Sequence, residues 1–419
     1  MKVFKFGGAS INSIDRIKNV GKILDSFKGD PILVIISAIG KTTNALEKVA
    51  ESFFAGNKEE ALHLFAAIKS EHIALVAQLG LRSVAGLGDL FTEVEWLLHD
   101  KPVRDYDYYY DQIVCCGELL STAILSDYFN SVNITNTWVD VRDTFSTDNN
   151  FREASIDWKT TAHKVQKNIV PLFLKQKIVI TQGFIGATDE NESTTLGREG
   201  SDYSAAIFAN LLNAHSQTIW KDVEGVFSAD PKKFPEATII KELSYSEVIE
   251  MAYYGAQVIH PKTIKPIQNK DIPLHVRCFL QPELMGTIIS NKVVQGLPSI
   301  IVIKEKQVLM ELRSKDFSFV EEKPVGKLYE LFEQIKIRPN LSQNGAISIL
   351  YCLDDKSDRI EKLALAASEL FDVQLEKNLT LLTVRHFTDA VLQELTKGKI
   401  KLLSQQNRDT IQIVMKDAK

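Results

Sequence analysis

Short apolar runs without polar alternation are the feature that most constrains the fold of this chain. Such runs suit strands that helices bury on both faces of a parallel sheet. They occur at residues 3–6, 32–37, 178–182, 218–221 and 274–278. Helical stretches such as S-D-Y-S-A-A-I-F-A-N-L-L separate them. This alternation predicts an α/β fold with a mainly parallel sheet and ligands beyond the carboxyl ends of the strands.

The pattern changes near residue 290. The chain has 419 residues, which is enough for two or three domains of about 100–200 residues each. N-K-V-V-Q-G-L-P-S reads as a linker. Beyond it, strands at 300–312, 346–351 and 379–385 alternate with helices at 325–335 and 358–370, and the chain closes on T-I-Q-I-V-M. We therefore predict one domain over residues 1–290 and a small α+β region over 300–419.

Charge and cysteine content exclude several classes of protein. The net charge of −5 gives no basic field for nucleic acid or an anionic membrane. No apolar run reaches the ~20 residues of a membrane span. The four cysteines lack zinc-site spacing and are expected to be buried and reduced. A first strand at residue 3 leaves no room for a signal peptide, so a cytoplasmic location is expected.

A lysine and two glycines follow the first strand, in K-F-G-G-A-S. Gly7 and Gly8 let the backbone approach an anion closely, and Lys5 supplies a positive charge. A helix expected from about Ser13 would point its amino end at the same place. The block suits phosphate binding, although a purely structural turn fits these residues equally well.

The segment T-T-L-G-R-E-G-S-D-Y-S-A-A brackets an arginine with two glycines at the start of a helix. Ser201 is predicted as the N-cap of that helix. A cap explains neither Arg198 nor the glycines, whereas a guanidinium in a glycine loop suits bidentate recognition of a carboxylate.

Gly40-Lys41-Thr42 resembles the end of a phosphate-binding P-loop. The full pattern needs a glycine five positions earlier, where this chain has Ile35 inside a strand. We therefore expect no P-loop. The remaining turn, residues 37–44, ends a central strand, and its hydroxyls and amides could hold a carboxylate.

Three further blocks complete the pattern. W-K-D-V-E-G-V-F-S-A-D-P-K-K fits a loop over a nucleotide. Y-G-A-Q-V-I-H-P-K-T starts a helix at His260-Pro261, and capping or packing explains His260 better than metal binding. C-C-G-E-L-L-S puts Glu118 near the front of a helix.

These blocks, in this order and with S-A-I-G-K-T-T-N, resemble those of the aspartate kinases of the amino-acid-kinase superfamily over about residues 1–290. The resemblance implies a three-layer α/β/α sandwich, and C-terminal regulatory units of ACT type after residue 300. It implies phosphoryl transfer from ATP, with Mg²⁺, to the side-chain carboxylate of L-aspartate. That reaction is the entry step to lysine, threonine and methionine. The family also implies a homodimer or higher oligomer.

The family's motifs carry roles onto matching residues. Lys5, Gly7 and Gly8 would hold the transferring phosphoryl group, and Asp202 would orient the lysine and the substrate. No residue is assigned to a metal. The substrate would be bound by Ser37, Thr43, Glu118, Arg198 and Ser201, and ATP would be contacted by Lys221, Asp222, Phe227 and Lys232.

The chain departs from the family at several positions. Gln257 stands where the family often has a phosphate-binding lysine, and Lys221, Lys233 and Lys262 are the candidates to replace that lysine. Lys232 replaces an arginine. The effector loop reads F-S-F-V-E-E-K-P, and the second regulatory unit is expected to be shortened. Effector contacts would fall near Asn340, Ser342 and Gln343. Control by lysine, by threonine or by neither stays open.

Two alternatives compete with an aspartate kinase. Another acceptor, such as glutamate, N-acetylglutamate, carbamate or UMP, would keep the superfamily but change the substrate. Alternatively, the chain would be a weakly catalytic regulatory protein that senses an amino acid, and Gln257 in place of the lysine would be the cause of its weak catalysis. The ordered blocks favour aspartate, and retention of Lys5, Arg198 and Asp202 favours catalysis.

Overall fold

The computed structural model forms two compact units. It describes residues 1–27, 29–256, 258–316, 319 and 322–418. The first unit comprises Met1–Val226, Lys241–Ile249 and Ile259–Val294, and the second comprises Phe227–Ile240, Glu250–Val258 and Gln295–Lys419. The second unit thus includes two segments that precede residue 290. The domain ranges of 1–290 and 300–419 stay a prediction.

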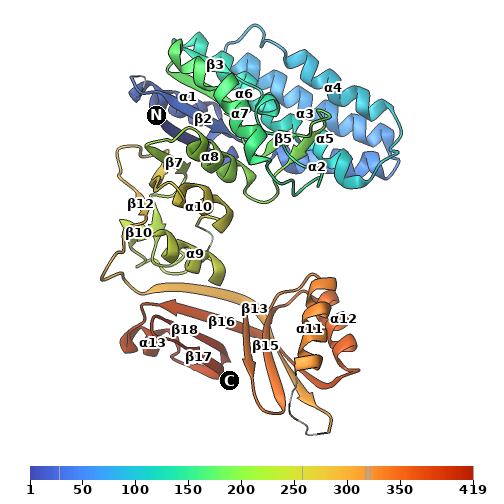
Figure 1. Cartoon of the computed structure of the whole chain (residues 1–419), viewed down its shortest axis with the longest axis vertical. Coiled ribbons are helices and arrows are strands. Elements are labelled where there is room, and N and C mark those ends of the chain that lie inside the picture. Colours follow the sequence, from blue (N-terminus) through green and yellow to red (C-terminus); the bar gives the residue numbers. More distant parts are fainter. Residues whose placement is uncertain (28, 257, 317–318, 320–321, 419) are drawn as a thin grey trace. The chain divides into compact units, whose positions relative to one another are not determined.

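An eight-stranded sheet forms the centre of the first unit (Figure 1). Its order is β10-β12-β11-β7-β1-β2-β4-β3, and every neighbouring pair is parallel except β11 with β12. The strands are β1 (Lys2–Phe6), β2 (Ile32–Ile36), β3 (Asn136–Trp138), β4 (Ile178–Gln182), β7 (Ser216–Lys221), β10 (Glu242–Ser244), β11 (Leu274–Cys278) and β12 (Thr287–Ser290). The predicted α/β class with a mainly parallel sheet is confirmed.

Helices cover both faces of this sheet (Figure 1). Phe4 and Phe6 of β1 point into a large core shared with α1 to α6. Side chains alternate along a strand, so Lys5 points to the opposite face, where α8 contacts β1, β2 and β7. The helices are α1 (Ile14–Ser26), α2 (Thr42–Phe54), α3 (Lys58–Gln78), α4 (Leu87–His99), α5 (Tyr106–Val114), α6 (Cys116–Ser131), α7 (Trp158–Asn168), α8 (Gly200–Leu211), α9 (Tyr245–Tyr254) and α10 (Pro261–Gln268).

Short elements connect these parts. In the described part of the chain, 3-10 turns lie at Gly8–Ile11, Val141–Asp143 and Val170–Leu174. Strand β5 (Ile185–Ala187) pairs antiparallel with β6 (Ser193–Thr195), and β8 (Val226–Phe227) forms a two-stranded sheet with β9 (Ile239–Ile240). All four cysteines are buried and unbridged, as predicted. Among the described residues, no helix is both long enough and apolar enough to cross a bilayer.

A six-stranded sheet forms the centre of the second unit, in the order β14-β15-β13-β16-β18-β17 with every pair antiparallel. Its long central strands, β13 and β16, pair along most of their length, with a register shift between Lys304 and Gln307. The elements are β13 (Ile300–Ser314), α11 (Glu322–Gln334), β14 (Leu341–Asn344), β15 (Ser348–Asp354), α12 (Ser357–Ala367), β16 (Phe371–Arg385), α13 (Asp389–Leu395), β17 (Lys399–Gln406) and β18 (Thr410–Asp417).

This region has the antiparallel α+β character expected of ACT-like units. Helices α11 and α12 pack with β13 and β15 around Leu328, Tyr351 and Leu363. A second core joins β16 and β18 to α13 around Leu382 and Ile413. The segment that was compared with the family's effector loop lies largely outside the described residues.

Two segments from before residue 290 are bonded to the long strands of the second unit. Ile301 N–H on β13 donates to the carbonyl of Ser228 at 2.8 Å. Lys233 Nζ lies 2.5 Å from Glu305 Oε1 in an ion pair. Arg385 at the end of β16 pairs with Glu250 at 3.3 Å. Residues 227–240 and 250–258 therefore belong with the C-terminal sheet by their contacts.

Gly183 allows α8 to pack tightly on the first sheet. A Cβ at this position would lie 2.7 Å from Cα and Cβ of Ser201 and 2.8 Å from Cγ2 of Ile35. Because backbone and core atoms surround the position, even a methyl group would displace the first turn of α8.

We expect Gly183→Ala to lower the free energy of unfolding by about 1–3 kcal/mol, the usual cost of overpacking. Urea unfolding would measure this loss. Gly88→Ala is the matched control, since a Cβ there meets nothing within 4 Å inside α4. It should be neutral or stabilising by up to about 1 kcal/mol. Equal effects of the two substitutions would contradict the tight packing.

Candidate active site

Lys5 and Asp202, which come from separate sequence blocks, form an ion pair. Lys5 Nζ lies 2.7 Å from Asp202 Oδ1, and the two side chains are 14% and 6% exposed. Asp202 lies in the first turn of α8, on the face of the sheet to which Lys5 points. The ammonium has three N–H donors, so it can bind a further anion besides Asp202.

The two glycines after Lys5 bring the β1 turn against the turn after β2. A Cβ on Gly8 would lie 2.6 Å from the carbonyl oxygen of Ala38, and Gly40 N–H donates to the Gly8 carbonyl at 3.2 Å. A Cβ on Gly7 would lie 3.3 Å from Nζ of Lys5. The glycines therefore leave open backbone beside the lysine, and Gly8 also joins the two turns.

Glu118 is a buried carboxylate with one unsatisfied oxygen. It lies in the first turn of α6 and is 2% exposed. Oε1 accepts a hydrogen bond from Ala38 N–H at 3.2 Å, while Oε2 has no partner among the described residues. Burial raises the pKa of Glu118 to about 8, against opposing effects of the Ala38 N–H and the nearby Lys5 charge. A buried, unpartnered oxygen is the expected form of a site that awaits a donor such as an ammonium.

Ser37 and Thr43 lie in the turn that carries β2 into α2. The carbonyl of Ser37 accepts a hydrogen bond from Ser121 Oγ at 2.8 Å, which fixes the turn to α6. Helix α2 begins at Thr42, so Thr43 lies in its first turn. Ile35 lies inside β2, as expected, which agrees with the exclusion of a P-loop.

Arg198 lies in a loop of unusual backbone geometry. Gly197 and Glu199, its neighbours, have φ values of +75° and +55°. The Arg198 side chain is exposed and has no hydrogen bond or ion pair with the described residues. The guanidinium is therefore available to a ligand.

The prediction that Ser201 is the N-cap of α8 is wrong. The helix begins at Gly200, and Glu199 in the left-handed conformation occupies the cap position. Ser201 is instead 8% exposed within the first turn. The backbone reversal at Glu199 starts the helix earlier than the preference of serine for caps indicates.

The predicted nucleotide residues fall in different parts of the chain. Lys221 ends β7 and is half-buried, and Asp222 follows in an exposed turn. Phe227 and Lys232 belong to the second unit, where the backbone N–H of Lys232 donates to Asp230 Oδ1 at 3.0 Å. Gln257 lies outside the described residues.

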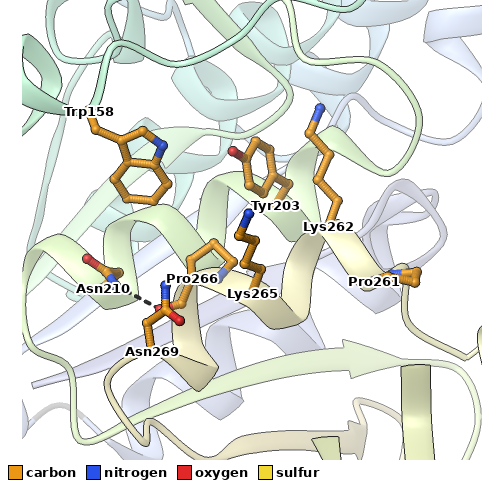
Figure 2. A pocket seen from close by; sticks show the side chains of 8 residues that line it. All are labelled: Trp158, Tyr203, Asn210, Pro261, Lys262, Lys265, Pro266 and Asn269. Atoms are coloured by element: carbon orange, nitrogen blue, oxygen red, sulfur yellow. Dashed lines mark hydrogen bonds between the residues drawn. The ribbon is translucent and has the colours of Figure 1, made fainter. Parts of the chain in front are cut away.

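Two of the lysines considered as substitutes for the missing cation are already engaged. Lys233 pairs with Glu305. Lys262 donates to the Leu196 carbonyl at 2.9 Å and lies 4.7 Å from the ring centre of Tyr203, and burial lowers its pKa. Figure 2 shows Lys262 beside Tyr203 at a pocket of about 710 Å³ between α8 and α10, where Asn210 bonds to the Pro266 carbonyl.

His260 is a helix cap, as expected. Its Nδ1 accepts a hydrogen bond from Lys262 N–H at 3.2 Å at the start of α10. Among the described residues, no group of three or more His, Cys, Asp or Glu side chains could hold a metal ion.

Asp111 is a positioning residue that the sequence reasoning missed. It is fully buried on α5 and accepts hydrogen bonds from Thr195 N–H at 2.8 Å, Thr195 Oγ at 2.7 Å and Arg152 N–H at 2.9 Å. It thereby holds the strand that leads into the Arg198 loop. Burial raises the pKa of Asp111 to about 6. Its one sequence signal is an aspartate within an apolar helical stretch, Y-Y-Y-D-Q-I-V.

Comparison with known proteins decides the family. The model of the amino acid kinase family matches residues 1–278. Lysine-sensitive aspartokinase 3 of Escherichia coli is 31% identical over 396 residues, which are 91% of this chain and 86% of that protein. The chain belongs to the aspartokinases of the amino acid kinase family. Aspartokinase 2, chloroplastic, of Arabidopsis thaliana is 30% identical over 84% of this chain and 66% of its own length.

Solved structures agree with this family. The crystal structure of E. coli aspartokinase III in complex with aspartate and ADP has a TM-score of 0.82 and 26% identity, and covers 99% of this chain and 96% of that one. The same enzyme in complex with lysine and aspartate gives a TM-score of 0.81, covering 100% and 96%. The expected resemblance, the fold class and the assignment as an ATP-dependent kinase are confirmed.

The raised pKa of Glu118 makes stability depend on pH. The pKa is 4.5 in the ordinary case and about 8 in the fold, so the folded state retains a proton that the unfolded chain releases. The contribution of Glu118 to the free energy of unfolding is therefore complete below pH 4.5 and is lost as the pH rises to about 8.

Glu118→Gln should remove this dependence, because the amide stays neutral. We expect the unliganded parent to lose a few kcal/mol relative to the variant between about pH 5 and pH 8, at about 1.4 kcal/mol per pKa unit. Urea unfolding of both proteins across this range would measure the difference. A difference independent of pH would show that the pKa of Glu118 is not perturbed.

Proposed function

We propose that this aspartokinase transfers the γ-phosphoryl group of ATP to the side-chain carboxylate of L-aspartate, giving 4-phospho-L-aspartate and ADP. The observation that carries the proposal is the unpartnered oxygen of buried Glu118, close enough to Lys5 for the lysine charge to act on its pKa. An α-amino acid with a second carboxylate suits this combination of an anion and a cation.

Substrate recognition would use charges of both signs. The ammonium of aspartate would donate to Oε2 of Glu118, and its α-carboxylate would bind the exposed guanidinium of Arg198. The side-chain carboxylate would lie at the turn that carries Ser37 and Thr43, and Ser201 would complete the contacts from α8. A ligand without the ammonium would leave Glu118 unpaired, which costs several kcal/mol on the scale of about 3–5 for a broken buried pair.

The chemical step needs no general base, because the attacking group is already a carboxylate. The main barrier is the approach of two anions, so positioning and cations dominate catalysis. Lys5, with N–H donors beyond its pair with Asp202, would hold the transferring phosphoryl group together with the open backbone of Gly7 and Gly8. Asp202 would keep Lys5 in place. Lys221, Asp222, Phe227 and Lys232 would contact ATP.

Mg²⁺ fits this site as a companion of the nucleotide. In kinases the ion usually keeps several waters and binds one or two carboxylates together with the phosphates. The lack of a cluster of three acidic or metal-ligating residues among those described suits this mode. The ion would neutralise phosphate charge, and the residues of the chain would orient the reactants.

Regulation and assembly are part of the same proposal. The complex of E. coli aspartokinase III with lysine makes lysine the first effector to test, with threonine second. We expect a homodimer or higher homo-oligomer, which light scattering would measure. The cytoplasmic location and entry into lysine, threonine and methionine synthesis stay predictions.

Aspartate-dependent ADP release in a coupled assay with Mg-ATP tests the activity, and Lys5→Met tests the site. Losing the phosphoryl-holding cation should lower kcat by about 10²–10³-fold. Lys2→Met is the matched control, since Lys2 lies on the same strand but pairs with Asp30 at 2.6 Å. It should keep parental kcat. Absence of aspartate-dependent ADP release from the parent would refute the function, and an active Lys5→Met variant would refute the role of Lys5.

Substrate binding should also release a proton from Glu118. An ammonium beside the carboxylate favours its charged form, and the free pKa of about 8 leaves Glu118 mostly protonated at neutral pH. We therefore expect KM for aspartate to fall as the pH rises from about 6 to about 8, by up to tenfold per pH unit.

The Glu118→Gln variant should have a higher KM that varies little with pH. Glu51→Gln, an exposed change on α2, should keep the parental profile. Steady-state kinetics across this range would measure all three proteins. A parental KM that does not change with pH would contradict binding of the ammonium at Glu118.

A further inference from the structure

The pocket of about 710 Å³ in Figure 2 lies where α7, α8 and α10 meet, all within the first unit. Its volume is within the usual range of about 300–1,000 Å³ for small-molecule sites. In the described part of the chain, two aromatic residues, two lysines, two asparagines and two prolines line it. The pocket therefore combines ring surfaces with positive charge, and none of these lining residues is acidic.

The pocket lies on a different side of α8 from the proposed active site. Tyr203 and Asn210 both line the pocket, and residues seven apart lie on the same face of a helix. Asp202 is the neighbour of Tyr203, but adjacent residues of a helix point in different directions. Asp202 is directed to Lys5 on the sheet and is almost completely buried. The residues assigned to aspartate and ATP do not line the pocket.

Two aromatic side chains offer ring surface and unused donors. Trp158, the first residue of α7, is 39% exposed although it is an indole. Tyr203 is half-buried, and burial raises its pKa, so its hydroxyl stays protonated. Neither the indole N–H nor this hydroxyl has a hydrogen bond with a described residue. Figure 2 shows the two rings on either side of the pocket, with the side chain of Lys265 rising toward the space between them.

Two lysines supply positive charge from α10. Lys262 and Lys265 are three residues apart, so they lie on the same face of that helix. Lys265 is exposed and has no hydrogen bond or ion pair with the rest of the described chain. Lys262 is half-buried and donates to the Leu196 carbonyl at 2.9 Å. Burial lowers the pKa of Lys262, against the opposing effect of the Glu153 charge. An anion in the pocket would favour the charged form of Lys262.

We propose that this pocket is a second ligand site, for a flat aromatic acid, that is, an aromatic ring that carries a carboxylate or a phosphate. The ring would stack on Trp158 beside Tyr203, and the anionic group would pair with Lys265 and Lys262. A zwitterionic amino acid suits the pocket less well, because its ammonium would lie beside two lysines without a carboxylate among the described lining.

Calorimetric titration of the full chain with 1-naphthylacetate tests the site. We expect saturable binding that persists with saturating aspartate and Mg-ADP. 1-Naphthylacetamide lacks the charge and cyclohexylacetate lacks the aromatic ring, and each should bind about tenfold or more weakly, because either the ion pair or the stacking is lost.

A titration with 1-naphthyl phosphate distinguishes the two anions. Tighter binding than that of 1-naphthylacetate would assign a phosphate ligand to the site, and weaker binding would assign a carboxylate. Absence of saturable binding of both compounds up to about 10 mM, or their displacement by aspartate or Mg-ADP, would overturn the proposal.

Two variants locate the site. Trp158→Ala should weaken binding of 1-naphthylacetate about tenfold, because the stacking surface is lost. Trp96→Ala is the matched control, since Trp96 is 74% exposed on α4 and does not line the pocket. Lys265→Met should remove the preference for 1-naphthylacetate over its amide. Lys159→Met is its control, an exposed lysine of α7 outside the pocket.

All four variants should keep the parental kcat and circular dichroism spectrum, because each substitution is at an exposed position outside the proposed active site. Parental affinity for 1-naphthylacetate in both Trp158→Ala and Lys265→Met would refute the site. An equal loss of affinity in the two control variants would refute it as well.

Discussion

The buried ion pair between Lys5 and Asp202 is the constraint on which the site depends. A lysine inside a strand between apolar neighbours is tolerated because an acidic side chain on the covering helix compensates its charge. Because side chains alternate along β1, Lys5 lies on the face of the sheet that α8 covers. The close packing at Gly183 brings the first turn of α8 near to Lys5. The same contacts that allow the charge to be buried thus place it where parallel strands end.

Glu118 complements that pair because its charge is not compensated. The backbone N–H of Ala38 donates to Oε1, no described residue donates to Oε2, and burial raises the pKa of the carboxyl so that it retains a proton. Under the proposed function, a cationic ligand that replaced the proton would recover the cost of this state. Selectivity for an ammonium would then come from a carboxylate that has no partner for Oε2 in the unliganded protein. Asp111 is the opposite case, a buried carboxylate that accepts three hydrogen bonds.

Sequence reasoning located the central sheet, because its strands give local patterns, while the assigned site residues stay a prediction. All five predicted strands of the first unit are present, since short apolar runs give a strong local signal. His260 behaves as the cap that its position before proline indicates. The cap of α8 was misassigned because a left-handed Glu199 is invisible in the sequence. Strand β3, three residues long, and the role of Asp111 depend on contacts between distant segments.

The attachment of residues 227–240 to the C-terminal sheet has a consequence for control of the enzyme. This segment carries Phe227 and Lys232, which we assign to ATP, and its backbone is hydrogen-bonded to β13 at Ser228. A ligand that favours one arrangement of the C-terminal sheet would therefore also favour one position of β13, the strand to which this segment is hydrogen-bonded. Allosteric coupling between two binding sites requires such a shared element. If an effector changes the affinity for ATP by some factor, thermodynamic linkage then requires that ATP change the affinity for the effector by the same factor.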